Sequence, residues 1–147
     1  MAKHNYRCIT IQKINVAELA ESVRGAEVVV GIDVAKHRFV AVISTERRDL
    51  NFFVSWEAPT STRAFVELVL ALKDTSSKLS VAMEPTGTYG DPLRALLLCE
   101  DVPVYRVSPK RVHDASEDFD GVPSSHDPKA AAIVAQQHWD GKSHLRR

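Results

Sequence analysis

The chain has 147 residues, about the size of one compact domain. Apolar residues make up 44% and charged residues 26%, as in an ordinary globular protein rather than a disordered chain. Acidic and basic residues number 19 each, so the net charge does not by itself indicate a nucleic-acid partner. No apolar run approaches the roughly 18 residues of a membrane span, and the N-terminus lacks the apolar core of a signal peptide. We therefore expect a cytoplasmic protein without membrane contact, in which Cys8 and Cys99 are free thiols.

The first part of the chain predicts an arm over residues 1–26 that contains one short helix. Residues 1–13 show no periodicity and are expected to be irregular. Asn15 can then cap a helix with one apolar stripe, which ends near Gly25. Residues 27–35 change the pattern, because they are β-branched and almost continuously apolar, which is typical of a central strand.

Two further strands follow at short intervals. Residues 38–45 begin after only Lys36 and His37, which is close enough for a hairpin. Residues 49–56 form a third strand after a charged turn. Strands joined by such tight turns are expected to be antiparallel neighbours.

Helices and strands alternate in the rest of the chain. The predicted elements are, in order, a helix capped by Thr60 or Ser61, a strand over 78–85, a helix over 91–100 with Asp91 as its cap, a strand over 102–109, a helix over 110–119 and a closing helix over 127–139. Strands separated by helices run parallel through right-handed crossovers. This order is that of a ribonuclease H-like α/β domain: a mixed sheet of three antiparallel strands followed by parallel strands, with flanking helices. We expect the domain to span residues 27–138 and a basic tail to cover 139–147.

Three acidic residues have positions that suit a metal site. Asp33 lies inside the first predicted strand, where an unpaired charge is costly. Glu84 ends the fourth strand, and ligands of open α/β sheets gather at the carboxyl ends of strands. Asp127 opens the closing helix. Because Mg²⁺ takes oxygen ligands and keeps several waters, two or three such carboxylates suffice to hold it.

Each acid also has a simpler interpretation. Asp33 can be an edge residue or can pair with Lys36 or His37, and Glu84 can be a solvated strand end. Asp127 is followed by a proline and can be a plain helix cap, as in the Asp91–Pro92 pair. These alternatives stay open on residue type alone.

Each of the three acids lies in a short sequence motif, and the order of the three motifs along the chain is informative. "GIDVAK", "MEPTGTYG" and the Asp-led helix "HDPKAAAIVA", between residues 28 and 135, resemble the DEDD-type transposases of bacterial insertion sequences. That family includes the Piv/MooV DNA invertases and the RNA-guided bridge recombinases. The resemblance implies a RuvC-like N-terminal domain that binds Mg²⁺ or Mn²⁺ through four acids. Asp33, Glu84 and Asp127 match the first three acids, which are both catalytic and metal-binding.

The sequence departs from the family pattern in two ways. The fourth acid position, three residues after Asp127 on the same helix face, is Ala130. Family members also continue into a C-terminal domain with a catalytic serine, which we expect to be absent here. No serine lies in a context that matches this catalytic serine. We interpret three serines as turn residues, namely Ser124, Ser125 and Ser143.

These features predict the N-terminal domain of a transposase or recombinase that acts on DNA phosphodiesters in DNA transposition. The alternative is a catalytically silent, truncated domain that serves dimerisation or the binding of DNA or a guide RNA. The resemblance implies DNA as partner, a guide RNA in one branch of the family, and self-association. A sugar-kinase-like ATPase shares the fold but needs a glycine-rich phosphate loop after the first strand, and "DVAKHRF" contains no glycine.

Basic residues and one turn complete the candidate surface. The predicted nucleic-acid contacts are Lys36, Arg106, Lys110 and Arg111, although solvated surface charge is the simpler interpretation of such residues. Thr86, Gly87 and Tyr89 form the turn after Glu84, and we expect Tyr89 to pack against the following helix. His126 is either a proton shuttle or incidental.

Overall fold

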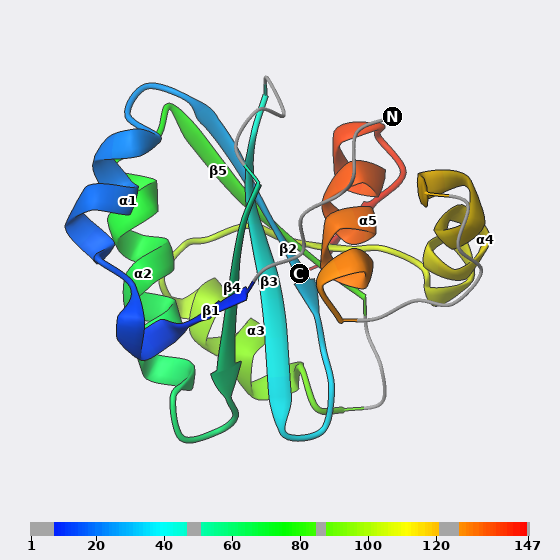
Figure 1. The fold of residues 1–147 in the computed structure, drawn as a ribbon, viewed down its shortest axis with the longest axis horizontal. Coiled ribbons are helices and arrows are strands. Elements are labelled where there is room, and N and C mark those ends of the chain that lie inside the picture. Colours follow the sequence, from blue (N-terminus) through cyan, green and yellow to red (C-terminus); the bar gives the residue numbers. More distant parts are fainter. Residues whose placement is uncertain (1–7, 47–50, 85–87, 121–126, 147) are drawn as a thin grey trace.

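The protein is described by a computed structural model for residues 8–46, 51–84, 88–120 and 127–146 (Figure 1). In this part of the chain, seven strands form one sheet in the order β1-β4-β3-β2-β5-β6-β7. The strands are β1 (Cys8–Thr10), β2 (Glu27–Asp33), β3 (Arg38–Thr45), β4 (Asn51–Glu57), β5 (Lys78–Glu84), β6 (Val104–Arg106) and β7 (His144–Arg146). The helices are a 3-10 turn η1 (Ile11–Lys13), α1 (Val16–Ser22), α2 (Thr62–Thr75), α3 (Asp91–Cys99), α4 (Pro109–Asp120) and α5 (Asp127–Trp139).

The predicted ribonuclease H-like sheet is confirmed. Strands β2, β3 and β4 are antiparallel neighbours, while β5 runs parallel to β2 and β6 runs parallel to β5. The connections through α2 and α3 are long enough for the parallel pairs, as the alternation of strands and helices predicted.

The two outermost strands were not predicted. β1 runs parallel to β4, with Cys8 beside Phe53, and η1 follows it directly. The expectation that residues 1–13 are irregular is therefore wrong for residues 8–13. β7 lies antiparallel to β6, with Leu145 beside Tyr105. Each strand has three residues, too few to show a period of two, and each exists because a longer strand offers it an edge.

The helix boundaries agree with the predicted caps in one case and differ in another. The Asn15 side chain accepts a hydrogen bond of 3.0 Å from the backbone N–H of Glu18, as predicted for the start of α1. The prediction that Asp91 caps α3 is wrong, since Gly90 precedes the helix and Asp91 is already its first residue. As predicted, Cys8 and Cys99 do not form a disulfide.

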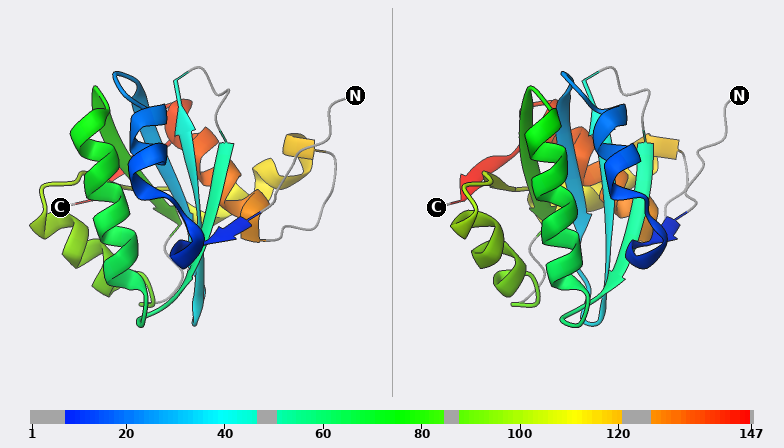
Figure 2. Two further views of the ribbon diagram at one scale, coloured as in Figure 1. Left: turned by 60° about the vertical axis from the view of Figure 1, so that its left-hand side comes forward. Right: turned by 90° about the vertical axis from the view of Figure 1, so that its left-hand side faces the viewer.

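Helices cover both faces of the sheet (Figure 2). On one face, α1, α2 and α3 pack over a large core that includes Val28, Val30 and Ile32 of β2. On the other face, α5 packs with Val29 and with neighbouring residues of β3 and β4. Alternate residues of a strand point to opposite faces. Asp33 therefore shares the α5 face of the sheet with Val29.

Gly31 lets α5 cross β2 at very short range. A Cβ atom at Gly31 would lie 2.6 Å from the backbone oxygen of Ala131 and 2.7 Å from the backbone nitrogen of Ala135. Further along α5, the indole N–H of Trp139 donates a hydrogen bond of 2.6 Å to Ser44 Oγ. Ser44 pairs with Val29 in the first half of β2, so α5 runs opposite to β2 and begins at the Asp33 end.

Candidate metal and nucleic-acid site

Asp33 and Glu84 form a pair at one edge of the sheet. They are the last residues of β2 and β5, and the parallel register places them directly beside each other. Glu84 shares the face of Ala82, which belongs to a cluster with residues of α5. Adjacent strands lie about 4.8 Å apart, so the sheet sets two half-buried carboxylates side by side on the α5 face.

The surroundings of Glu84 disfavour negative charge. Burial raises the pKa of the Glu84 carboxyl above its ordinary value. A second carboxylate on the next strand adds repulsion when both groups are ionised. A cation between them relieves both effects, and this chemistry fits a hard divalent ion with oxygen ligands.

The first turn of α5 lies at the same end of the sheet. Asp127 is the first residue of α5, as predicted, and its side chain lies outside the described part of the structure. Ala130 is 6% exposed. It precedes Val134 by one helical turn, and Val134 shares its cluster with Ala82. The fourth acid position of the family is thus filled by a buried methyl group on the β5 side of α5.

Among the residues that the structure describes, no group of three or more histidine, cysteine, aspartate or glutamate side chains could hold a metal ion. The described part of the site is therefore the pair Asp33 and Glu84. His126, Thr86 and Gly87 also lie outside the described residues.

The predicted basic contacts lie on elements next to β2 and β5, and Arg106, which pairs with Met83, lies on the sheet face opposite to the acidic pair. Lys36 is exposed in the turn between β2 and β3, directly after Asp33. Arg106 is exposed at the end of β6, the strand beside β5. Lys110 and Arg111 are exposed in the first turn of α4. Carboxyl ends of parallel strands meet at one edge of a sheet, so Arg106 lies at the edge that carries Glu84.

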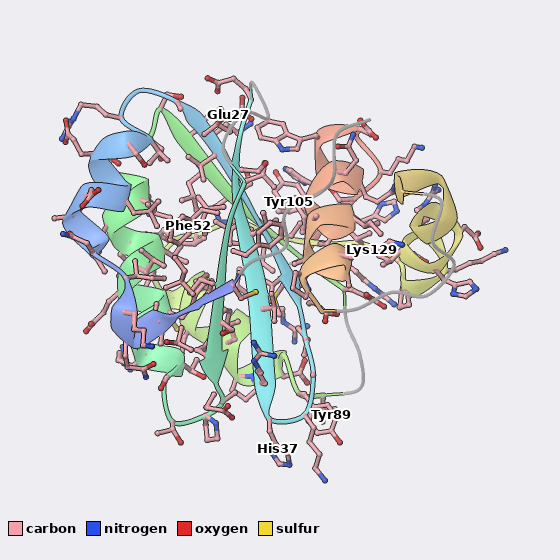
Figure 3. All side chains as sticks on the ribbon, in the orientation of Figure 1. Glu27, His37, Phe52, Tyr89, Tyr105 and Lys129 are labelled. Atoms are coloured by element: carbon pink, nitrogen blue, oxygen red, sulfur yellow. The ribbon has the colours of Figure 1, made fainter. Side chains whose placement is uncertain are left out.

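Two residues near the pair have surroundings that the sequence did not indicate. Lys129, between Asp127 and Ala130, is 0% exposed, and Figure 3 shows it on the side of α5 that faces α4. A buried lysine is rare, and its one signal in the sequence is a cation inside an otherwise apolar helix. Tyr89, which was expected to pack against α3, is 45% exposed.

A histidine and a serine contact each other at the opposite end of the sheet. The His138 ring lies 2.7 Å from Ser143 Oγ through Nδ1, and 4.5 Å from the Tyr105 ring between centroids. Burial and the charge of Lys78 lower the pKa of His138, while Glu27 opposes them. Lys78 and Glu27 begin β5 and β2, so this contact is remote from Asp33 and Glu84.

The fold is RuvC-like. A structure titled "T. thermophilus RuvC in complex with Holliday junction substrate" superposes with a TM-score of 0.53 at 15% identity, over 82% of this chain and 99% of that chain. A second structure of Thermus thermophilus RuvC gives the same TM-score and identity over 81% and 99% of the two chains. No curated protein matches the sequence.

Residues 30–147 match the family model DEDD_Tnp_IS110, described as a transposase. The chain therefore belongs to the DEDD transposase family, as the three motifs predicted. No helix in the described ranges has the length and apolar character needed to cross a membrane.

Proposed function

We propose that this chain is the N-terminal domain of an insertion-sequence transposase or recombinase that acts on DNA phosphodiesters through a carboxylate-bound divalent metal. The observation that carries the proposal is the register of Asp33 and Glu84. Two carboxylates end adjacent parallel strands on the face that the start of α5 covers. Burial raises the pKa of the Glu84 carboxyl, and a cation bound beside it would favour its ionised form.

In this proposal, Asp33, Glu84 and Asp127 hold Mg²⁺ or Mn²⁺. When bound, such an ion stabilises the attacking and leaving oxygens of a phosphodiester and activates the nucleophile. The exposed cations around the pair hold the DNA backbone at the edge of the sheet, because phosphate contacts position a nucleic acid. Those cations are Lys36, Arg106, Lys110 and Arg111.

The remaining parts of the proposal rest on the family. The partner is DNA, with a guide RNA in the RNA-guided branch, and the protein self-associates in the cytoplasm. In the recombinase branch the acids assist a serine from a further domain.

A second candidate function is a catalytically silent domain that binds nucleic acid or dimerises. The observation that favours it is Ala130, a buried methyl group where the family has an acid. A site with one ligand fewer binds a divalent ion more weakly, since affinity follows the charge and number of its ligands. Metal affinity separates the two candidates.

The test is titration calorimetry with Mg²⁺ and Mn²⁺ on the unmodified chain and on Asp33→Asn, Ala130→Asp and Asp74→Asn. Asp74 is an exposed carboxylate of α2, so Asp74→Asn controls for the loss of one surface charge. Binding by the unmodified chain that is lost in Asp33→Asn and kept in Asp74→Asn supports the metal-dependent function. Binding by Ala130→Asp alone supports the silent domain. Absence of binding in all four proteins refutes the metal site.

A further inference from the structure

Tyr89 presents an aromatic ring to solvent at the end of the molecule that also carries His37 of the turn between β2 and β3. Within the described ranges, the exposed large hydrophobic side chains are Tyr89, at 45%, and Leu145, at 48%. An exposed aromatic ring offers a flat face on which an unpaired nucleic-acid base can stack. Leu145 lies on β7, whereas Tyr89 precedes α3.

The backbone beside Tyr89 is packed against the ends of β2 and β5. A Cβ atom at Gly90 would lie 2.8 Å from Met83 Cε and 3.3 Å from Val34 Cγ2. Met83 precedes Glu84 and Val34 follows Asp33 in the chain. Both Met83 and Val34 are buried on the face of the sheet opposite to Asp33 and Glu84, so core packing holds the backbone beside Tyr89 at the ends of these strands.

Two exposed basic side chains lie on the neighbouring hairpin. Lys36 and His37 occupy the turn between β2 and β3, and two extended residues span at most about 7 Å from Val34 to Lys36. The backbone oxygen of His37 accepts a hydrogen bond of 2.8 Å from the N–H of Ala58, which fixes the turn. Figure 3 shows His37 and Tyr89 at the same end of the molecule.

We propose that Tyr89, Lys36 and His37 form a contact site for single-stranded nucleic acid, in which a base stacks on the Tyr89 ring and Lys36 and His37 hold an adjacent phosphate. An aromatic platform beside basic side chains is the arrangement by which single strands are bound, because every unpaired base offers a π-face. Asp33 and Glu84 repel phosphates, so the cations beyond Asp33 supply the attraction that keeps a strand at this edge.

The inference deepens the proposed function, on which it rests for the identity of the partner. Within that function, the site selects a melted strand over a duplex, since paired and stacked bases have no free face for Tyr89. Tyr89 is thus a positioning residue that holds an unpaired strand at the edge of the sheet where β2 and β5 end with the two carboxylates.

The experiment measures the fluorescence anisotropy of a labelled single-stranded DNA, an RNA of the same sequence and the matching DNA duplex. The proteins are the unmodified chain, Tyr89→Ala, Tyr89→Phe, Lys36→Ala and two controls, Leu145→Ala and Lys142→Ala. Leu145 is the other exposed large apolar residue, and Lys142 is an exposed lysine after α5. Titrations are run in EDTA at several salt concentrations.

We expect Tyr89→Ala to bind single strands about 5-fold to 150-fold more weakly, the effect of losing one stacked base. Tyr89→Phe keeps the ring and should retain affinity within about threefold. Lys36→Ala should lower the salt dependence of single-strand binding by about 0.7 in the slope of log K against log salt. Both controls should leave affinity and slope unchanged.

Affinities of Tyr89→Ala and Leu145→Ala that agree within twofold on both the DNA and the RNA strand would overturn the proposal. It would also be overturned if Tyr89→Ala weakened the duplex as much as the single strands, because stacking on an unpaired base predicts a difference. Weakening of either single strand alone supports it and identifies the sugar that is preferred. EDTA removes divalent metal, so these titrations do not depend on the metal site. If they refute the single-strand contact, the calorimetric test of the metal site still stands on its own.

Discussion

Replacing Gly31 by alanine places a methyl group where α5 crosses β2. The new Cβ would lie 2.6 Å from the Ala131 oxygen, 2.7 Å from the Ala135 nitrogen and 2.8 Å from the Ala135 Cβ. Ordinary contact begins at 3.4 Å, so α5 must move by 3.4 − 2.6 = 0.8 Å. Two of the three obstructing atoms belong to the backbone and cannot rotate away.

Overpacking of this kind lowers the free energy of unfolding by about 1–3 kcal/mol. We expect the upper half of that range, because backbone atoms are involved. For a chain of this size, the expected fall in Tm is about 5–10 °C, measured by thermal and urea denaturation. Gly90→Ala is the matched control, since its closest obstruction is the mobile end of Met83, and we expect it to cost less than about 1 kcal/mol. If Gly31→Ala were within about 0.5 kcal/mol of the unmodified chain, the reasoning from close approach would be refuted.

Three further predictions concern single side chains. Glu84→Gln removes a charge that burial disfavours, so without metal at neutral pH it should raise the free energy of unfolding in urea by up to about 1 kcal/mol; a decrease would contradict this. Because the pKa of His138 is lowered from 6.5, the unfolded chain takes up the proton more readily and stability should fall as pH drops below about 6.5. His138→Gln should flatten that fall, and an unchanged pH profile would exclude His138 as its source. Trp139→Phe leaves buried Ser44 without its indole donor, so the free energy of unfolding, measured by denaturation, should fall by about 1–2 kcal/mol. The same substitution made in a Ser44→Ala protein should lower the free energy of unfolding by less.

The central sheet could be predicted because its strands are long and apolar. The run that contains Asp33 and the run that ends at Glu84 each have seven residues in the structure, enough to show their type and their ends. Their order along the chain then implied that both carboxylates lie at one edge. The residue-by-residue register, which sets Asp33 directly beside Glu84, depends on packing between segments and is not contained in either run.

The surroundings of individual side chains were harder to predict. Lysine is usually exposed, so the burial of Lys129, on a helix that packs against both the sheet and α4, could not be predicted from residue type. A tyrosine before an apolar helix suggests packing, but Tyr89 is an exposed residue in the structure. Both cases depend on contacts between distant parts of the sequence.

The register of the acidic pair also determines when the site can form during synthesis. Asp33 and Glu84 are 84 − 33 = 51 positions apart, whereas β2, β3 and β4 are joined by short turns. Local antiparallel pairs close early, and a parallel pair must wait for the whole crossover through β3, β4 and α2. A nascent chain that has not yet released β5 from the ribosome carries Asp33 without its neighbour. Assembly of the two carboxylates is therefore tied to the emergence of β5, so that a chain without β5 holds no paired acids.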